Sequence, residues 1–177
     1  MEHTWDILTY LIDGCAISIF LFLIAAVFIP ALKNVRSTYL RIANTTFSIL
    51  GLIALGISIV LYSMIAIDLR DNELLGFLSH RAKFILAGLL LLGIVPIMAL
   101  FGKRVTQTGF TCLLLIVVII ITHIDATSQW LTNLTGFYSF PGGHLYEAPI
   151  VKWYRLLIAL LFFVICYWFT RRKISRA

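Results

Sequence analysis

Five runs of apolar residues, each close to the length that crosses a membrane, take up most of this 177-residue chain. A transmembrane helix needs about 20 mostly apolar residues, within a range of roughly 17–25. A segment in lipid must satisfy its own backbone hydrogen bonds, so each run is predicted to be helical. We therefore predict an all-α integral membrane protein, a bundle of five transmembrane helices at residues 7–32, 42–67, 84–101, 108–124 and 153–170.

The composition supports the bilayer as the solvent of this protein. Hydrophobic residues make up 61% of the chain, whereas a soluble domain averages roughly 45–50%. Because the composition does not shift partway along the sequence, residues 1–177 are predicted to form a single transmembrane domain.

The positive charges predict the orientation of the helices, because cytoplasmic loops carry an excess of lysine and arginine. Basic residues follow the first, third and fifth runs, and every Asp and Glu falls at the opposite ends of the runs. The N-terminus is therefore predicted outside and the C-terminus in the cytoplasm, with a long outer loop at residues 125–152. The basic residues are Lys33, Arg36, Arg41, Lys103, Arg104, Arg171, Arg172, Lys173 and Arg176.

Other residues predict details of the bundle. The aromatic pattern predicts an inner interfacial belt that includes Tyr39, and Pro30 is expected to help end the first helix. Small residues in the second and third runs predict that these two helices pack closely together. These small residues include Gly51, Ala54, Gly88 and Gly93.

The net charge of +6 is explained by this topology and gives no reason to expect nucleic acid as a partner. The basic segments need no acidic partner beyond anionic lipid headgroups. Since the chain has neither a phosphate-binding glycine loop nor a histidine deep in any run, no nucleotide and no haem are expected.

Histidines on the predicted outer side are the strongest candidates for chemistry. Imidazole is the commonest protein metal ligand, and nearby carboxylates can complete a site. Copper or zinc would suit this set, although its spacing matches no fixed metal motif. Alternatively, these histidines only make hydrogen bonds at the interface. The predicted metal ligands are His80, His123, His144, Asp125 and Glu147.

Asp13 is a second candidate, because an ionisable residue within a transmembrane segment usually faces a cavity or a partner. Arg81 and Lys83, at the start of the third run, are predicted partners for Asp13 or Asp125. Two interpretations of Asp13 remain open. If the segment 14–32 spans the membrane alone, Asp13 lies at the headgroups instead of forming an intramembrane polar site.

From residue 40 to residue 123 the order of features resembles the copper-resistance D family of bacterial inner-membrane proteins. A basic approach enters a helix rich in small residues (LRIANTTFSILGLIALGISIVLYSM), a glycine precedes a basic helix start (GFLSHRAKFILAGLLLLG), and a basic turn (FGKR) precedes another apolar helix. The resemblance implies a role in moving or handling copper and a location in a bacterial cytoplasmic (inner) membrane. The fifth run and the long loop lie outside it.

The leading hypothesis is a membrane protein that binds or transports a transition metal at its outer face, with copper first. The first alternative is a non-catalytic subunit or assembly factor of a larger membrane complex, docking other membrane protein subunits through its aromatic loop. The second is a membrane enzyme that acts on a lipid-like substrate at the outer interface.

Overall fold

The computed structural model describes residues 2–68, 82–123 and 149–175, and these residues form helices without any strand. A short 3-10 helix, η1, joins α4 to α5. The elements are α1 (Glu2–Phe28), α2 (Pro30–Asp68), α4 (Ala82–Phe101), η1 (Lys103–Thr106), α5 (Thr108–Thr122) and α7 (Pro149–Ile174). The all-α prediction is confirmed for the part of the chain that the structure describes.

Three of these helices contain segments long and apolar enough to cross a membrane: Thr4–Phe28, Pro30–Met64 and Trp153–Ile174. Two further apolar segments, Leu86–Phe101 and Thr108–Thr122, are shorter. Large apolar side chains such as Phe20 and Leu160 are exposed on the outside of the bundle. Such a surface needs lipid around it, so the architecture is that of an integral membrane protein.

The helix boundaries correct several of the predicted ones. The predicted run 7–32 is divided, because α1 ends at Phe28 and Pro30 begins α2. Proline suits the first position of a helix, where its missing N–H has no intrahelical partner in any case. The basic segment predicted as a loop, 33–41, is therefore the start of α2 and continues directly into the run 42–67.

The fourth and fifth helices also differ from their predicted bounds. α5 ends at Thr122, two residues before the predicted end of the run 108–124. α7 begins at Pro149 and ends at Ile174, so it extends the run 153–170 in both directions and takes residues 149–152 from the predicted loop 125–152. The rest of that loop lies outside the described residues.

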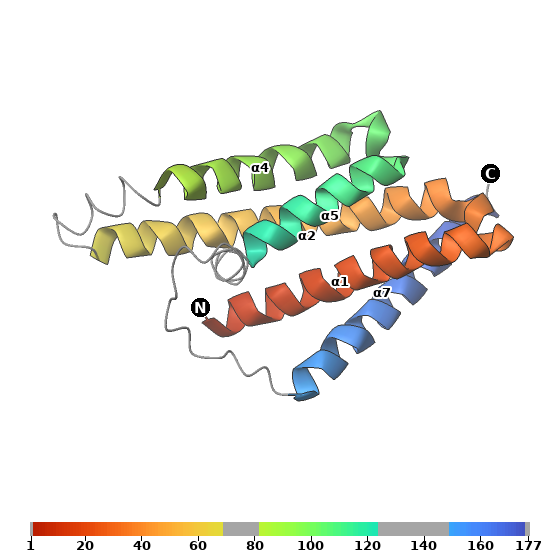
Figure 1. Cartoon of the computed structure of the whole chain (residues 1–177), viewed down its shortest axis with the longest axis horizontal. Helices are drawn as coiled ribbons and strands as arrows, with labels where there is room; N and C mark the ends of the chain where they lie inside the picture. The colour runs from red at the N-terminus through yellow and green to blue at the C-terminus, as the bar shows by residue number, and fades with distance from the viewer. Residues whose placement is uncertain (1, 69–81, 124–148, 176–177) are drawn as a thin grey trace, which may run out of the picture.

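The helices alternate in direction (Figure 1). One end of the bundle holds the start of α1 and the end of α5, and we name it the outer end after the predicted topology. The opposite inner end holds the junction of α1 with α2, the η1 turn and the end of α7. Helix α1 packs against α7 and α2, and α2 packs against α4. The basic segments at 33–41, 103–104 and 171–173 therefore all lie at the inner end.

The predicted close packing of the second and third apolar runs is confirmed by α2 and α4. A Cβ atom added to Gly51 would lie 3.3 Å from Cγ of Pro96 in α4 and 3.2 Å from Cγ2 of Val118 in α5. The missing side chain lets three helices approach one another. α4 is helical on both sides of Pro96.

An aromatic stack fills the core where α1, α2 and α7 meet. The rings of Phe22 and Tyr39 are stacked with centroids 3.6 Å apart, and Phe163 lies against both. Tyr39 is completely buried, so its predicted place in an interfacial belt is wrong. Its hydroxyl lies 3.4 Å from Oγ of Ser18, which gives the polar end of the ring a partner within the bundle.

Asn44 fixes the η1 turn to α2 near the inner end. Its fully buried amide donates from Nδ2 to the carbonyl of Val105 at 2.7 Å and to Oγ1 of Thr111 at 2.8 Å. Buried polar groups need such partners, because water does not reach them. One side chain therefore holds α2, η1 and α5 together.

Removing the Asn44 amide should destabilise the protein. Asn44→Ala leaves the Val105 carbonyl without its buried donor, so the free energy of unfolding in detergent should fall by about 1–3 kcal/mol. Ser48→Ala is the matched control one helical turn away. Ser48 is equally buried, and its hydroxyl has no hydrogen-bond partner among the described residues. Equal losses in the two variants would contradict this role for Asn44.

Candidate functional site

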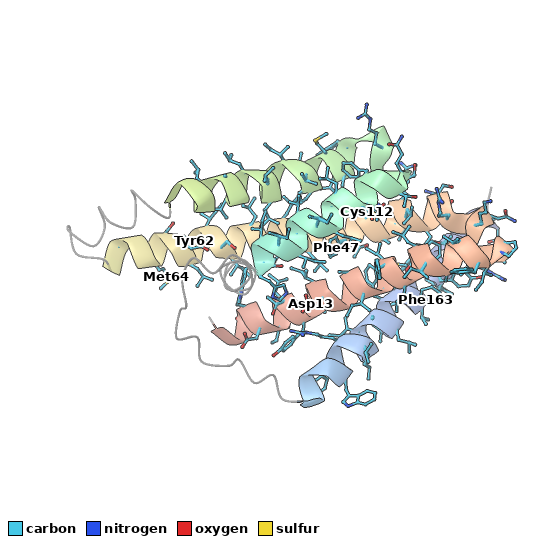
Figure 2. All side chains as sticks on the ribbon, in the orientation of Figure 1. Asp13, Phe47, Tyr62, Met64, Cys112 and Phe163 are labelled. Atoms are coloured by element: carbon cyan, nitrogen blue, oxygen red, sulfur yellow. The ribbon has the colours of Figure 1, made fainter. Side chains whose placement is uncertain are left out.

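A cluster of three ionisable side chains joins three helices towards the outer end of the bundle. Oδ1 of Asp13, in α1, lies 2.8 Å from Nε2 of His123, the residue that follows α5. Oδ2 of the same carboxylate lies 2.9 Å from Nε of Arg155, in the second turn of α7. Figure 2 labels Asp13 on α1. We call these three residues the Asp13 cluster.

The cluster is largely shielded from solvent. The side chains of Asp13, Arg155 and His123 are 14%, 20% and 28% exposed. The guanidinium of Arg155 also lies over the ring of Tyr10, with Cζ 5.5 Å from the ring centroid. The negative face of the aromatic ring therefore adds a second attraction for this cation.

The charges within the cluster are complementary. An ionised carboxylate only accepts hydrogen bonds, so a neutral His123 must donate its Nε2 proton to Asp13, and Nδ1 then carries the lone pair. The Arg155 cation balances the Asp13 anion. Since an unpaired charge in an apolar environment is costly, the Arg155 cation lowers the cost of placing a carboxylate there.

Gly14 allows α1 and α7 to lie close enough for Asp13 to contact Arg155. A Cβ atom added to Gly14 would lie 2.5 Å from Cγ2 of Ile158 and 3.1 Å from the carbonyl oxygen of Arg155. Any side chain at this position would therefore separate α1 from α7 next to the Asp13–Arg155 pair. The absence of a side chain at Gly14 therefore permits the contact between Asp13 and Arg155.

The position of the cluster along the helices bears on its depth in a membrane. Asp13 is 15 residues from the inner end of α1, His123 is 15 from the start of α5, and Arg155 is 16 from Arg171. At 1.5 Å per residue these distances are about 22–24 Å. A hydrocarbon layer is about 30 Å thick.

The helix boundaries bear on both interpretations of Asp13, which stay predictions. The span 14–32, which would have left Asp13 at the headgroups, is not a single helix, because α1 ends at Phe28. The candidate membrane span Thr4–Phe28 includes Asp13. Asp6, about two helical turns further out, is exposed. It is 22 residues from Phe28, or about 33 Å, which matches the thickness of the apolar layer.

Of the predicted metal ligands, only His123 belongs to the part of the chain that the structure describes. The other four, His80, Asp125, His144 and Glu147, lie outside it, as does Arg81. Lys83 lies in the first turn of α4, but its side chain is not described. Within the described residues, no group of three or more His, Cys, Asp or Glu side chains is placed to hold a metal ion.

Sequence reasoning named Asp13 and His123 separately but did not predict that they meet, since 110 residues separate them. Arg155 was not predicted as a site residue. One signal was available: Arg155 is the only cation inside the predicted run 153–170, and such a residue needs an anion or the membrane surface nearby. The pairing of α1 with α7 could not be deduced from this signal alone.

The comparisons with known proteins give no family for this chain. No protein-family model, no curated protein and no solved structure matches it. The resemblance to the copper-resistance D family therefore stays a prediction.

The role of Gly14 can be tested by adding one methyl group. Gly14→Ala forces α1 and α7 apart, so the free energy of unfolding in detergent should fall by about 1–3 kcal/mol. Gly56→Ala is the control, because a Cβ there meets nothing within 4 Å. It should leave stability unchanged or raise it by up to about 1 kcal/mol through helix propensity. A tolerated Gly14→Ala would contradict the close contact.

Proposed function

We propose that this chain is a five-helix protein of a bacterial cytoplasmic membrane that binds or passes a transition metal, copper before zinc, at its outer end. His123 is the metal ligand among the described residues. The observation that supports this most is the contact between Nε2 of His123 and Oδ1 of Asp13. It rests on residues that the sequence had singled out independently.

The chemistry of this contact resembles the support that metal-binding histidines receive elsewhere. Such a histidine commonly donates its second ring N–H to a carboxylate, which fixes the tautomer, orients the ring and raises its basicity. With Nε2 directed at Asp13, a neutral His123 carries its ring lone pair on Nδ1. Neutral imidazole suits copper and zinc better than it suits magnesium or calcium. In this proposal Asp13 positions the ligand and does not itself bind the metal.

The depth of the Asp13 cluster supports a functional role. Ionisable residues within the apolar layer are costly, and they mark the pathways of ions and protons in many membrane proteins. If Phe28 lies at the inner boundary, the cluster lies about 6–8 Å below the outer one. A cation that reaches it has left bulk water but has crossed only a fraction of the membrane. This position suits a binding site at the entrance of the bundle.

The proposed topology, with the C-terminus in the cytoplasm, is supported by the positions of the basic residues. The three basic segments lie together at the inner end of the bundle, as the excess of positive charge in cytoplasmic segments requires. α4 and α5 complete the five spans in this proposal. α5 has only 15 residues, or about 22 Å, so its outer terminus at the Asp13 cluster lies within the membrane.

Copper binding to the purified full-length protein tests the function. His123→Ala should weaken Cu²⁺ binding by at least about tenfold, because loss of even an outer-shell partner costs about 10–100-fold in affinity. All variants should carry Cys112→Ser, since Cys112 is an exposed free thiol and thiols bind copper themselves.

His3→Ala is the matched control, because it removes an imidazole that belongs to no predicted ligand set. It should leave the affinity for Cu²⁺ within about threefold, as for a change remote from the site. Absence of Cu²⁺ binding, or equal binding by the His123→Ala and unsubstituted proteins, would overturn the proposal.

A further inference from the structure

The inner end of α7 carries two arginines with exposed side chains, Arg171 and Arg172. No carboxylate among the described residues is placed to neutralise them, because the described acidic residues all lie in the outer halves of α1 and α2. A guanidinium keeps its charge at every pH that proteins experience. An anion that pairs with these cations therefore comes from outside the described part of the chain. The described acidic residues are Glu2, Asp6, Asp13 and Asp68.

Both guanidinium groups are held one helical turn back from the end of α7. Cζ of Arg171 lies 5.6 Å from the centroid of the Tyr167 ring, and its Nε donates to the Tyr167 hydroxyl at 3.3 Å. Cζ of Arg172 lies 5.3 Å from the centroid of the Trp168 ring. Each ring precedes its arginine by four residues, about one turn. The two cations are thus fixed beside aromatic faces that attract them.

This position brings the two charges to the edge of the apolar layer. Both arginines fall within the candidate membrane span Trp153–Ile174, and their guanidinium groups lie a further turn towards the middle of that span. A cation at this level is costly unless it pairs with an anion or reaches the headgroups. The phosphates of lipid headgroups are anions that lie at this level of a bilayer.

An apolar stripe leads along one face of α7 to Arg172. Its four members and Arg172 are spaced three or four residues apart, which places them on one face of a helix. Each of the four is more than half exposed, so this face needs an apolar covering. A cation at the end of such a stripe matches a lipid, which has an anionic phosphate next to its acyl chains. The four residues are Leu157, Leu161, Val164 and Trp168.

We propose that the inner end of α7 is a binding site for an anionic glycerophospholipid. Its phosphate pairs with Arg171 and Arg172, and an acyl chain covers the stripe that begins at Leu157. The planar guanidinium suits phosphate oxygens, which it can bind through two parallel hydrogen bonds. The aromatic contacts hold both groups in place before the lipid arrives, which lowers the entropy cost of binding.

The same features select among possible anions. A zwitterionic lipid brings its own cation next to the two arginines, so a lipid with net negative charge is favoured. A soluble acidic protein would neutralise the arginines but would leave the apolar stripe without acyl chains. This inference is independent of the metal-binding function proposed above, because none of its residues belongs to the Asp13 cluster.

Quenching of Trp168 by brominated lipids tests the site directly. Trp168 becomes the only tryptophan of the full-length protein when the other three are replaced by Phe. This protein would be reconstituted in phosphatidylcholine vesicles that contain brominated phosphatidylglycerol or brominated phosphatidylcholine at the same mole fraction. The binding constant for phosphatidylglycerol at Trp168 should exceed that for phosphatidylcholine by at least about fivefold. The three replacements are Trp5→Phe, Trp130→Phe and Trp153→Phe.

Two double variants distinguish a site from the general positive charge of the inner end. Arg171→Gln with Arg172→Gln should reduce the preference to less than about twofold. Arg41→Gln with Arg104→Gln is the matched control. It also removes two exposed charges, but beside η1, which packs against α2, α4 and α5. This control should keep the preference.

Three outcomes would overturn the inference. One is equal quenching by the two brominated lipids in the protein with all its arginines, a measurement that does not depend on the folding of the arginine variants. The second is a preference that Arg171→Gln with Arg172→Gln leaves unchanged. The third is an equal loss of preference in both double variants, which would show a diffuse attraction to the whole inner end.

Discussion

The packing of the outer half of this bundle depends on the contacts that the Asp13 carboxylate makes with His123 and Arg155. A single ionised group in an apolar environment is costly, and it is tolerated only when other groups compensate it. Here His123 and Arg155 each engage one carboxylate oxygen, at 2.8 and 2.9 Å. Because these partners come from the end of α5 and the start of α7, satisfying one charge fixes the relative positions of three helices.

The two ends of the bundle are held by different chemistry. At the outer end, charged groups meet where Gly14 lets α1 and α7 come into contact. At the inner end, the neutral amide of Asn44 joins α2 to η1 and α5, and an aromatic stack around Tyr39 fills the space between α1, α2 and α7. Among the described residues, partly buried ion pairs lie at the outer end, whereas the basic side chains of the inner end are exposed. This difference is consistent with a functional outer end and a structural inner one.

The sequence was sufficient to predict the helical class and the close packing of α2 with α4, because both follow from local patterns of apolar and small residues. It was misleading where tertiary contacts decide the outcome. The residues 33–41 are polar enough to suggest a loop, yet they continue α2, and Tyr39 is buried against Phe22 and not placed at an interface. The meeting of Asp13 with His123 depends on the arrangement of three helices, which no periodicity in the chain encodes.

A double-mutant cycle between Asp13 and Arg155 tests the central claim most directly. The free energy of unfolding in detergent would be measured for the unsubstituted protein, Asp13→Asn, Arg155→Gln and the double variant. Each single change leaves a partly buried charge without this partner and should cost at most about 3–5 kcal/mol, the range for fully buried pairs. The double variant should be more stable than the sum of the two losses by at least about 1 kcal/mol. Losses that add to within about 0.5 kcal/mol would show that the two charges do not depend on each other, and would contradict the account.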